Sequence, residues 1–222
     1  ARKGDFDDWI IAGTGLDRNR TITVNVERDE PLPAPDRIAG VIISGSHAMV
    51  TEQRPWSEKT AAWLRGAHTR VPILGICYGH QLLGYALGGK VADNPAGREM
   101  GTATINFNEQ AGHDPLFADS AGAIRAQVSH KQSLLALPPG AVLLGGSAGD
   151  PHQAFRCAAS SWGVQFHPEF DAAVTRTYID HCAQLLRDEG QDPEQLKEHC
   201  TESASGPALL QRFAAIVKQK NL

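Results

Sequence analysis

The sequence around Cys77 is typical of a cysteine that acts as a nucleophile. Residues 75–79 read Gly-Ile-Cys-Tyr-Gly, between an apolar run at 71–76 that predicts a buried strand and a helical pattern at 81–87. A sharp strand-to-helix turn of this kind projects the side chain from the edge of a sheet, and the flanking glycines permit close backbone approach. The helix N-terminus then favours the thiolate. The alternative is a buried, inert cysteine at the end of a strand, as free cysteines usually are.

A thiol nucleophile needs a base and usually a third group that orients the base, and His167 and Glu169 fit these roles. His167 ends a predicted strand at 162–166, and in α/β sheets chemistry gathers outside the carboxyl ends of strands. Pro168 stiffens the turn, so Glu169 can approach the imidazole, hold its tautomer and stabilise the imidazolium. The alternative is that this His-Pro-Glu turn merely caps the next helix.

Acyl transfer also builds an oxyanion, which needs preorganised N–H donors. One donor is the amide that follows the nucleophile, that of Tyr78. The second is expected from the Ser-Gly-Ser-His loop at 44–47, which follows a buried apolar strand at 41–43. An ordinary glycine turn is the alternative reading of that loop. His130 ends an extended segment and is a candidate for substrate contact.

These residues need a scaffold in which several strands end at one edge of a sheet. Short apolar runs bounded by Gly and Pro alternate with longer helical patterns, which indicates βα units and a largely parallel sheet. Further helices are expected at 56–67 and 171–189, and shorter strands at 102–107, 126–129 and 142–146. We therefore expect an α/β domain over residues 1–190. Helical patterns at 193–199 and 207–220 predict a C-terminal extension over 191–222.

Composition excludes several other classes of protein. The chain has 222 residues, with 21 Lys and Arg against 25 Asp and Glu, which gives a net charge of −4. This charge does not indicate the basic surface that nucleic-acid-binding proteins have. No stretch of about 18 apolar residues predicts a membrane span. The first residues lack the apolar core of a signal peptide. The four cysteines show no CxxC spacing, so free thiols in a cytoplasmic protein are expected.

Several segments together resemble the class I, or triad, glutamine amidotransferases. The main matches are Gly-Ile-Cys-Tyr-Gly-His-Gln-Leu-Leu at 75–83 and Gln-Phe-His-Pro-Glu at 165–169. Val-Ser-His at 128–130, Ser-Gly-Ser at 44–46 and Asp-Pro-Leu-Phe at 114–117 point toward the glutaminase domain of GMP synthetase and its stand-alone relatives. These landmarks follow one another in the family's order over residues 41–170.

The resemblance implies a central, mostly parallel sheet flanked by helices, of the flavodoxin-like kind, and a glutaminase that forms a γ-glutamyl thioester and releases ammonia. Cys77 would be the nucleophile, His167 the general base and then acid, and Glu169 the orienting group. The backbone N–H groups of Ser46 and Tyr78 would form the oxyanion hole. The residues that would hold glutamine are Gly45, Gln81, Ser129 and His130. No cofactor and no metal is implied.

The chain also departs from the family's pattern. Family members open with a short strand before the segment matching residues 5–11, and this chain begins almost directly there, so we expect that strand to be missing or the N-terminus to be truncated. The loop at 45–47 reads Gly-Ser-His where relatives commonly have Gly-Gly-Pro. No synthetase domain is attached, so ammonia would pass to a separate synthase subunit.

Two other functions stay open from the sequence. A γ-glutamyl peptidase or hydrolase would use the same three residues on a substrate with a different leaving group. A non-catalytic regulatory module would retain the fold alone, although the intact Cys77, His167 and Glu169 argue against it.

Overall fold

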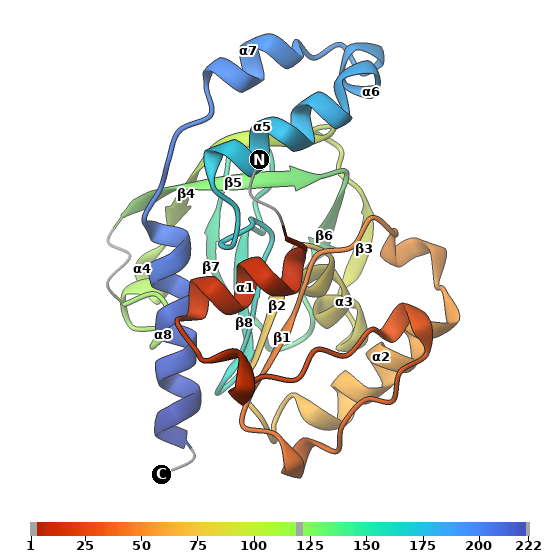
Figure 1. The fold of residues 1–222 in the computed structure, drawn as a ribbon, viewed down its shortest axis with the longest axis vertical. Coiled ribbons are helices and arrows are strands. Elements are labelled where there is room, and N and C mark those ends of the chain that lie inside the picture. Colours follow the sequence, from red (N-terminus) through yellow and green to blue (C-terminus); the bar gives the residue numbers. More distant parts are fainter. Residues whose placement is uncertain (1–3, 119–121, 221–222) are drawn as a thin grey trace.

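The computed structural model describes residues 4–118 and 122–220, which form a seven-stranded sheet with helices on both faces and a small two-stranded sheet at one side (Figure 1). The helices are α1 (Phe6–Thr14), α2 (Pro55–Ala67), α3 (Tyr78–Ala86), α4 (Glu109–Gly112), α5 (Ala172–His181), α6 (Ala183–Asp188), α7 (Pro193–Glu198) and α8 (Ser205–Lys220). The strands are β1 (Val41–Ile43), β2 (Ile73–Ile76), β3 (Lys90–Asp93), β4 (Glu99–Phe107), β5 (Ala123–His130), β6 (Gln132–Ala136), β7 (Val142–Gly146), β8 (Ala154–Ala158) and β9 (Ser161–Val164).

The large sheet has the order β1-β2-β9-β8-β7-β4-β5 and is mixed. Strands β1, β2 and β9 pair in parallel, whereas every other pair in this sheet is antiparallel. The α/β class predicted from the sequence is confirmed, but the expected predominance of parallel pairs is limited to these three strands. The reason is connectivity, because no helix separates β7, β8 and β9 and only the four-residue helix α4 lies between β4 and β5, and neighbours linked in this way pair antiparallel.

The core occupies both faces of the sheet because successive strand side chains point to opposite sides. On β2, Ile73 packs toward α2 and α3, whereas Leu74 packs toward α1 and α8. Helix α8 contributes Leu210 and Phe213 to the same buried cluster as Trp162 of β9. The second half of the C-terminal extension therefore packs directly against the central sheet.

The structure differs from the sequence-based expectation in several elements. The single helix expected at 171–189 is two helices, α5 and α6, because the backbone leaves helical geometry at Cys182 (φ −96°, ψ 7°). Helix α1 and strands β3, β6 and β8 lie outside the elements that the apolar pattern predicts; β3 has no fully buried residue, and α1 buries only Ile10 and Thr14. Within the described residues, no helix has both the length and the apolar character needed to cross a membrane.

Candidate active site

The segments that follow three adjacent parallel strands, β1, β2 and β9, lie at one edge of the sheet. Strand β2 ends at Ile76 and leads into Cys77, while the loop 44–48 follows β1 and the segment 165–169 follows β9. Because β2 lies between β1 and β9, Cys77 has one of these segments on each side. The strand order thus brings together the segments that carry the predicted oxyanion donor, nucleophile and base.

Cys77 occupies a strained turn between strand β2 and helix α3. Its φ of 50° lies in the left-handed region, which costs a residue other than glycine roughly 1–3 kcal/mol. The turn is held by a hydrogen bond from the Cys77 N–H to the Val164 carbonyl (2.8 Å). Both flanking glycines are required, because a side chain at Gly75 would collide with the Gly79 backbone and one at Gly79 would collide with the Ile43 carbonyl. The turn exposes only 7% of Cys77.

His167 and Glu169 form a buried hydrogen-bonded pair beside that thiol. The imidazole Nδ1 lies 2.7 Å from Glu169 Oε1, and the Cys77 side chain lies close enough to the imidazole to influence its charge. Burial alone would lower the pKa of His167, but the negative charges of Glu169 and of a Cys77 thiolate outweigh it and raise that pKa to about 10. The site therefore favours the imidazolium form of His167 beside Cys77.

Aromatic rings surround the imidazole, and the sequence reading did not predict them. The Phe170 ring stacks on His167 with a centroid distance of 4.1 Å and an interplanar angle of 10°. The Phe6 ring, from the first turn of α1, lies 6.1 Å from the imidazole at 26°. Phe170 directly follows the His-Pro-Glu turn, so its position was a usable signal, whereas nothing in the sequence linked Phe6 to His167. The rings fix the plane of the imidazole.

The loop 44–48 approaches the imidazole from the other side. A side chain at Gly45 would come within 2.9 Å of His167 Cε1, so this position has no room for one. The Ser46 hydroxyl donates to Glu27 Oε1 (3.0 Å) and accepts from the Ala48 N–H (3.1 Å). Glu27 belongs to the 3-10 helix Val26–Arg28 and is exposed, so a surface residue holds this loop.

Tyr78 begins helix α3, where backbone N–H groups have no intrahelical partner. Its ring points away from the thiol chemistry, since the Tyr78 hydroxyl lies 2.6 Å from Ser57 Oγ on α2. Burial raises the pKa of that phenol to about 12. The side chain therefore anchors the helix, and only the backbone of Tyr78 is suited to an oxyanion.

The predicted glutamine contacts divide into two kinds. The Ser129 carbonyl lies 3.7 Å from Cys77 Sγ, so the backbone of β5 reaches the site. The Gln81 amide instead donates to the Gln132 carbonyl (2.7 Å) and to Gln165 Oε1 (3.0 Å). The His130 ring is buried and bound to other protein groups. The structure thus brings Ser129 to the thiol and engages the side chains of Gln81 and His130 elsewhere.

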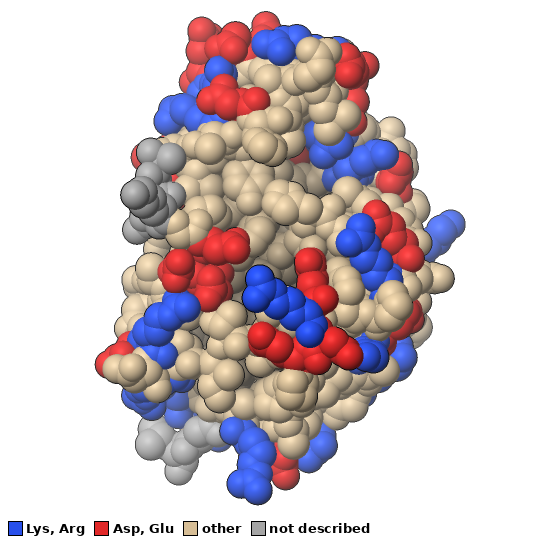
Figure 2. Space-filling model, turned by 45° about the vertical axis from the view of Figure 1, so that its right-hand side comes forward, with Lys and Arg blue, Asp and Glu red and all other residues tan. Residues whose placement is uncertain are grey.

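On the face drawn in Figure 2, acidic and basic side chains are interspersed around areas without charge. This mixture agrees with the small net charge of −4. Such a face creates no strong field of a single sign, which is what a polyanion would require.

Comparisons with known proteins agree with this geometry. A family model described as glutamine amidotransferase class-I matches residues 13–182. A glutamine amidotransferase-like protein of Schizosaccharomyces pombe is 28% identical over 174 residues, which cover 77% of this chain and 67% of that protein. A glutamine-hydrolysing GMP synthase of Thermomicrobium roseum is 40% identical over 131 residues, 59% of this chain and 23% of the synthase. The chain therefore spans only a small part of the synthase's own length.

Solved structures show the same fold. A glutamine amidotransferase from Thermotoga maritima superposes with a TM-score of 0.73 at 23% identity, covering 87% of this chain and 84% of that one. A glutamine amidotransferase from Methylobacillus flagellatus gives a TM-score of 0.70 at 26% identity, covering 97% of this chain and 87% of that one.

Proposed function

Since this chain belongs to the class I glutamine amidotransferases, we propose that it hydrolyses the side-chain amide of glutamine through a γ-glutamyl thioester on Cys77 and releases ammonia to a separate synthase. The observation that carries this proposal is the strained, buried Cys77 beside the His167–Glu169 pair. A core cysteine would need neither the strain nor the charged partner. A nucleophile needs both, because the turn projects the sulfur from the edge of the sheet and the imidazolium stabilises a thiolate.

In the first half of the reaction, the Cys77 thiolate attacks the amide carbon of glutamine. The oxyanion that forms accepts hydrogen bonds from the backbone N–H groups of Ser46 and Tyr78. His167 then gives its proton to the amide nitrogen, the carbon–nitrogen bond breaks, and ammonia leaves. Glu169 holds the imidazole so that the other ring nitrogen faces the sulfur and the leaving group.

In the second half, water attacks the γ-glutamyl thioester and His167, now neutral, removes its proton. The carbon–sulfur bond breaks, glutamate leaves, and Cys77 returns as the thiolate. The stacked rings of Phe170 and Phe6 keep the imidazole in one plane through both steps. The same group thus acts as acid and then as base.

The ammonia acceptor is proposed from the relatives. The curated GMP synthases are named as glutamine-hydrolysing enzymes, and this chain matches 23–24% of the length of two of them. The names of these relatives favour a nucleotide synthase as the acceptor of the ammonia.

A panel of glutamine, γ-glutamyl amines and γ-glutamyl peptides tests the donor. We expect glutamine to have the highest kcat/KM, measured as glutamate or amine released. A preference of more than ~10²-fold for a large leaving group, about 2.7 kcal/mol, would replace this proposal with a γ-glutamyl peptidase or hydrolase. Absence of both turnover and Cys77 labelling by a diazo-ketone analogue of glutamine would favour a non-catalytic module.

A further inference from the structure

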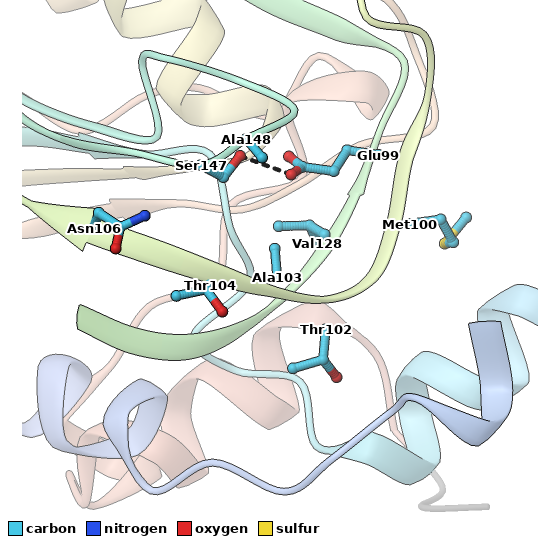
Figure 3. Close-up of a pocket in the computed structure, with 9 residues that line it drawn as sticks. All are labelled: Glu99, Met100, Thr102, Ala103, Thr104, Asn106, Val128, Ser147 and Ala148. Atoms are coloured by element: carbon cyan, nitrogen blue, oxygen red, sulfur yellow. Dashed lines mark hydrogen bonds between the residues drawn. The ribbon is translucent and has the colours of Figure 1, made fainter. Parts of the chain in front are cut away.

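A carboxylate on the far side of β5 from the nucleophile has an elaborate set of partners that the proposed reaction does not use. Glu99 lies at the start of β4, where β4 and the loop after β7 enclose a cavity of about 370 Å³ (Figure 3). Its Oε1 accepts from the Ser147 hydroxyl (2.7 Å), and its Oε2 accepts from Gln153 Nε2 (2.6 Å) and faces His130 Nε2 (2.9 Å). The Glu99 side chain is only 15% exposed.

The His130 ring lies between two acceptors. Its Nδ1 faces the Gln132 carbonyl at 3.0 Å, and its Nε2 faces the Glu99 carboxylate. A neutral imidazole has one N–H and can donate to only one of them, so both contacts are hydrogen bonds when each ring nitrogen carries a proton. The His130 side chain is 1% exposed, so its contact with Glu99 is deeply buried. An ion pair this deeply buried has strict geometric demands.

The Glu99–His130 pair adjoins residues 129–132, the segment of backbone that lies beside the Cys77 thiol. Glu99 and His130 are opposite each other in the β4–β5 ladder. Ser129, which precedes His130 on β5, places its carbonyl 3.7 Å from Cys77 Sγ. The Gln132 carbonyl that receives His130 Nδ1 also accepts from the Gln81 amide of the nucleophile helix. Residues 129–132 therefore touch helix α3 and its N-terminal cysteine from one side and Glu99 from the other.

We propose that Glu99 is a positioning residue for glutamine binding: through its ion pair with His130 it sets the place of the 129–132 backbone that lines the thiol. This inference rests on the proposed function. Glu99 touches neither the thiol nor the imidazole, which are held by the turn of α3, Glu169 and Phe170. Loss of the Glu99 charge therefore shifts the 129–132 backbone and leaves the thiol and the imidazole in place.

The test replaces the charge and keeps the shape. We expect Glu99→Gln to raise the KM for glutamine by ~10-fold or more while kcat stays within about 3-fold, because uniform binding is lost and the chemical step is not. Alkylation of Cys77 by iodoacetamide, followed on the Cys77 peptide, should keep its wild-type rate. Glu109→Gln, which removes an exposed carboxylate from the first turn of α4, is the matched control and should match wild type.

The outcomes separate the two proposals. Wild-type values of KM and kcat in a folded Glu99→Gln protein would overturn this inference and leave the proposed function standing. A joint fall of kcat, alkylation rate and melting temperature would also overturn it, since Glu99 would then act only in folding. A wild-type protein that hydrolyses no glutamine would remove the proposed function itself.

A double-mutant cycle locates the effect in the ion pair. In a His130→Asn background, which lacks the imidazole, we expect Glu99→Gln to change KM by less than about 2-fold, because the partner that transmits its effect is gone. Independent, multiplying effects of the two substitutions on KM would show that Glu99 acts by another route and would overturn the proposal.

Discussion

The two sides of the active site are built in different ways. The inner side carries Cys77, His167 and Glu169, which are buried and held by a strained turn, a short hydrogen bond and a stacked ring. The outer side is the loop 44–48, in which half-buried Ser46 hydrogen-bonds to Glu27, an exposed residue of another loop.

This difference separates two demands of acyl transfer. The groups that exchange protons and form covalent bonds need one fixed geometry, which dense packing supplies. The groups that receive the oxyanion need only be in place when charge develops. We therefore expect substitutions on the inner side to cost far more activity than substitutions that loosen the loop.

Cys77→Ala should have the largest effect. Without the sulfur no thioester forms, and we expect kcat for glutamine hydrolysis to fall by ~10⁴-fold or more, with the circular dichroism spectrum unchanged. Cys77→Ser should be nearly as damaging, because a hydroxyl loses its proton far less readily than a thiol. Cys157→Ser is the control and should retain activity, because the Cys157 thiol hydrogen-bonds to the Ser161 carbonyl (3.6 Å) and takes no part in the site. Full activity in either Cys77 variant would contradict the assignment of the nucleophile.

His167→Ala should lower kcat/KM more than Glu169→Ala does, because the imidazole transfers protons and the carboxylate only orients the imidazole. In a triad of this kind, loss of the base lowers kcat about 10²-fold more than loss of the orienting acid does. Comparison of kcat/KM for the two variants measures the gap. Equal losses would mean that Glu169 does more than hold the Nδ1 hydrogen bond.

Phe170→Leu should have an intermediate effect. Leucine fills part of the same volume but cannot stack at 4.1 Å on the imidazole, and aromatic contacts of this kind are worth ~1 kcal/mol. We expect a loss of ~5-fold in kcat, whereas Phe170→Tyr, which keeps the ring, should lose less than half of its rate. If both variants behave alike, the stacked ring does not hold His167.

Glu27→Gln should have the smallest effect. The substitution weakens the hydrogen bond from Ser46 and frees the outer loop, and one net hydrogen bond corresponds to about a 3-fold change in kcat. Asp29→Asn removes a neighbouring carboxylate that pairs instead with Lys59 on α2, so its kcat should equal that of wild type. A loss from Glu27→Gln as large as that from His167→Ala would break the contrast between the two sides.

Many of the helices and strands could be predicted from the sequence, because alternating strands and helices produce a clear pattern of apolar residues. The strands at 73–76 and 142–146 and the helix at 55–67 lie within a residue or a few of their expected bounds. The mixed character of the sheet could not be predicted, because it depends on which strands pair, and β4 pairs with both β5 and the more distant β7. The break at Cys182 was missed because nothing in its residue type ends a helix.

The sequence by itself was enough to propose the reacting residues, because their local chemistry lies within short segments: a cysteine flanked by nearby glycines, and a histidine two residues before a glutamate. Tertiary structure alone decided which residues support them. Phe6 lies 161 positions before His167, and Glu99 lies 31 positions before His130, yet each pair is in contact. Contacts over such separations depend on strand order and packing, which no local pattern records.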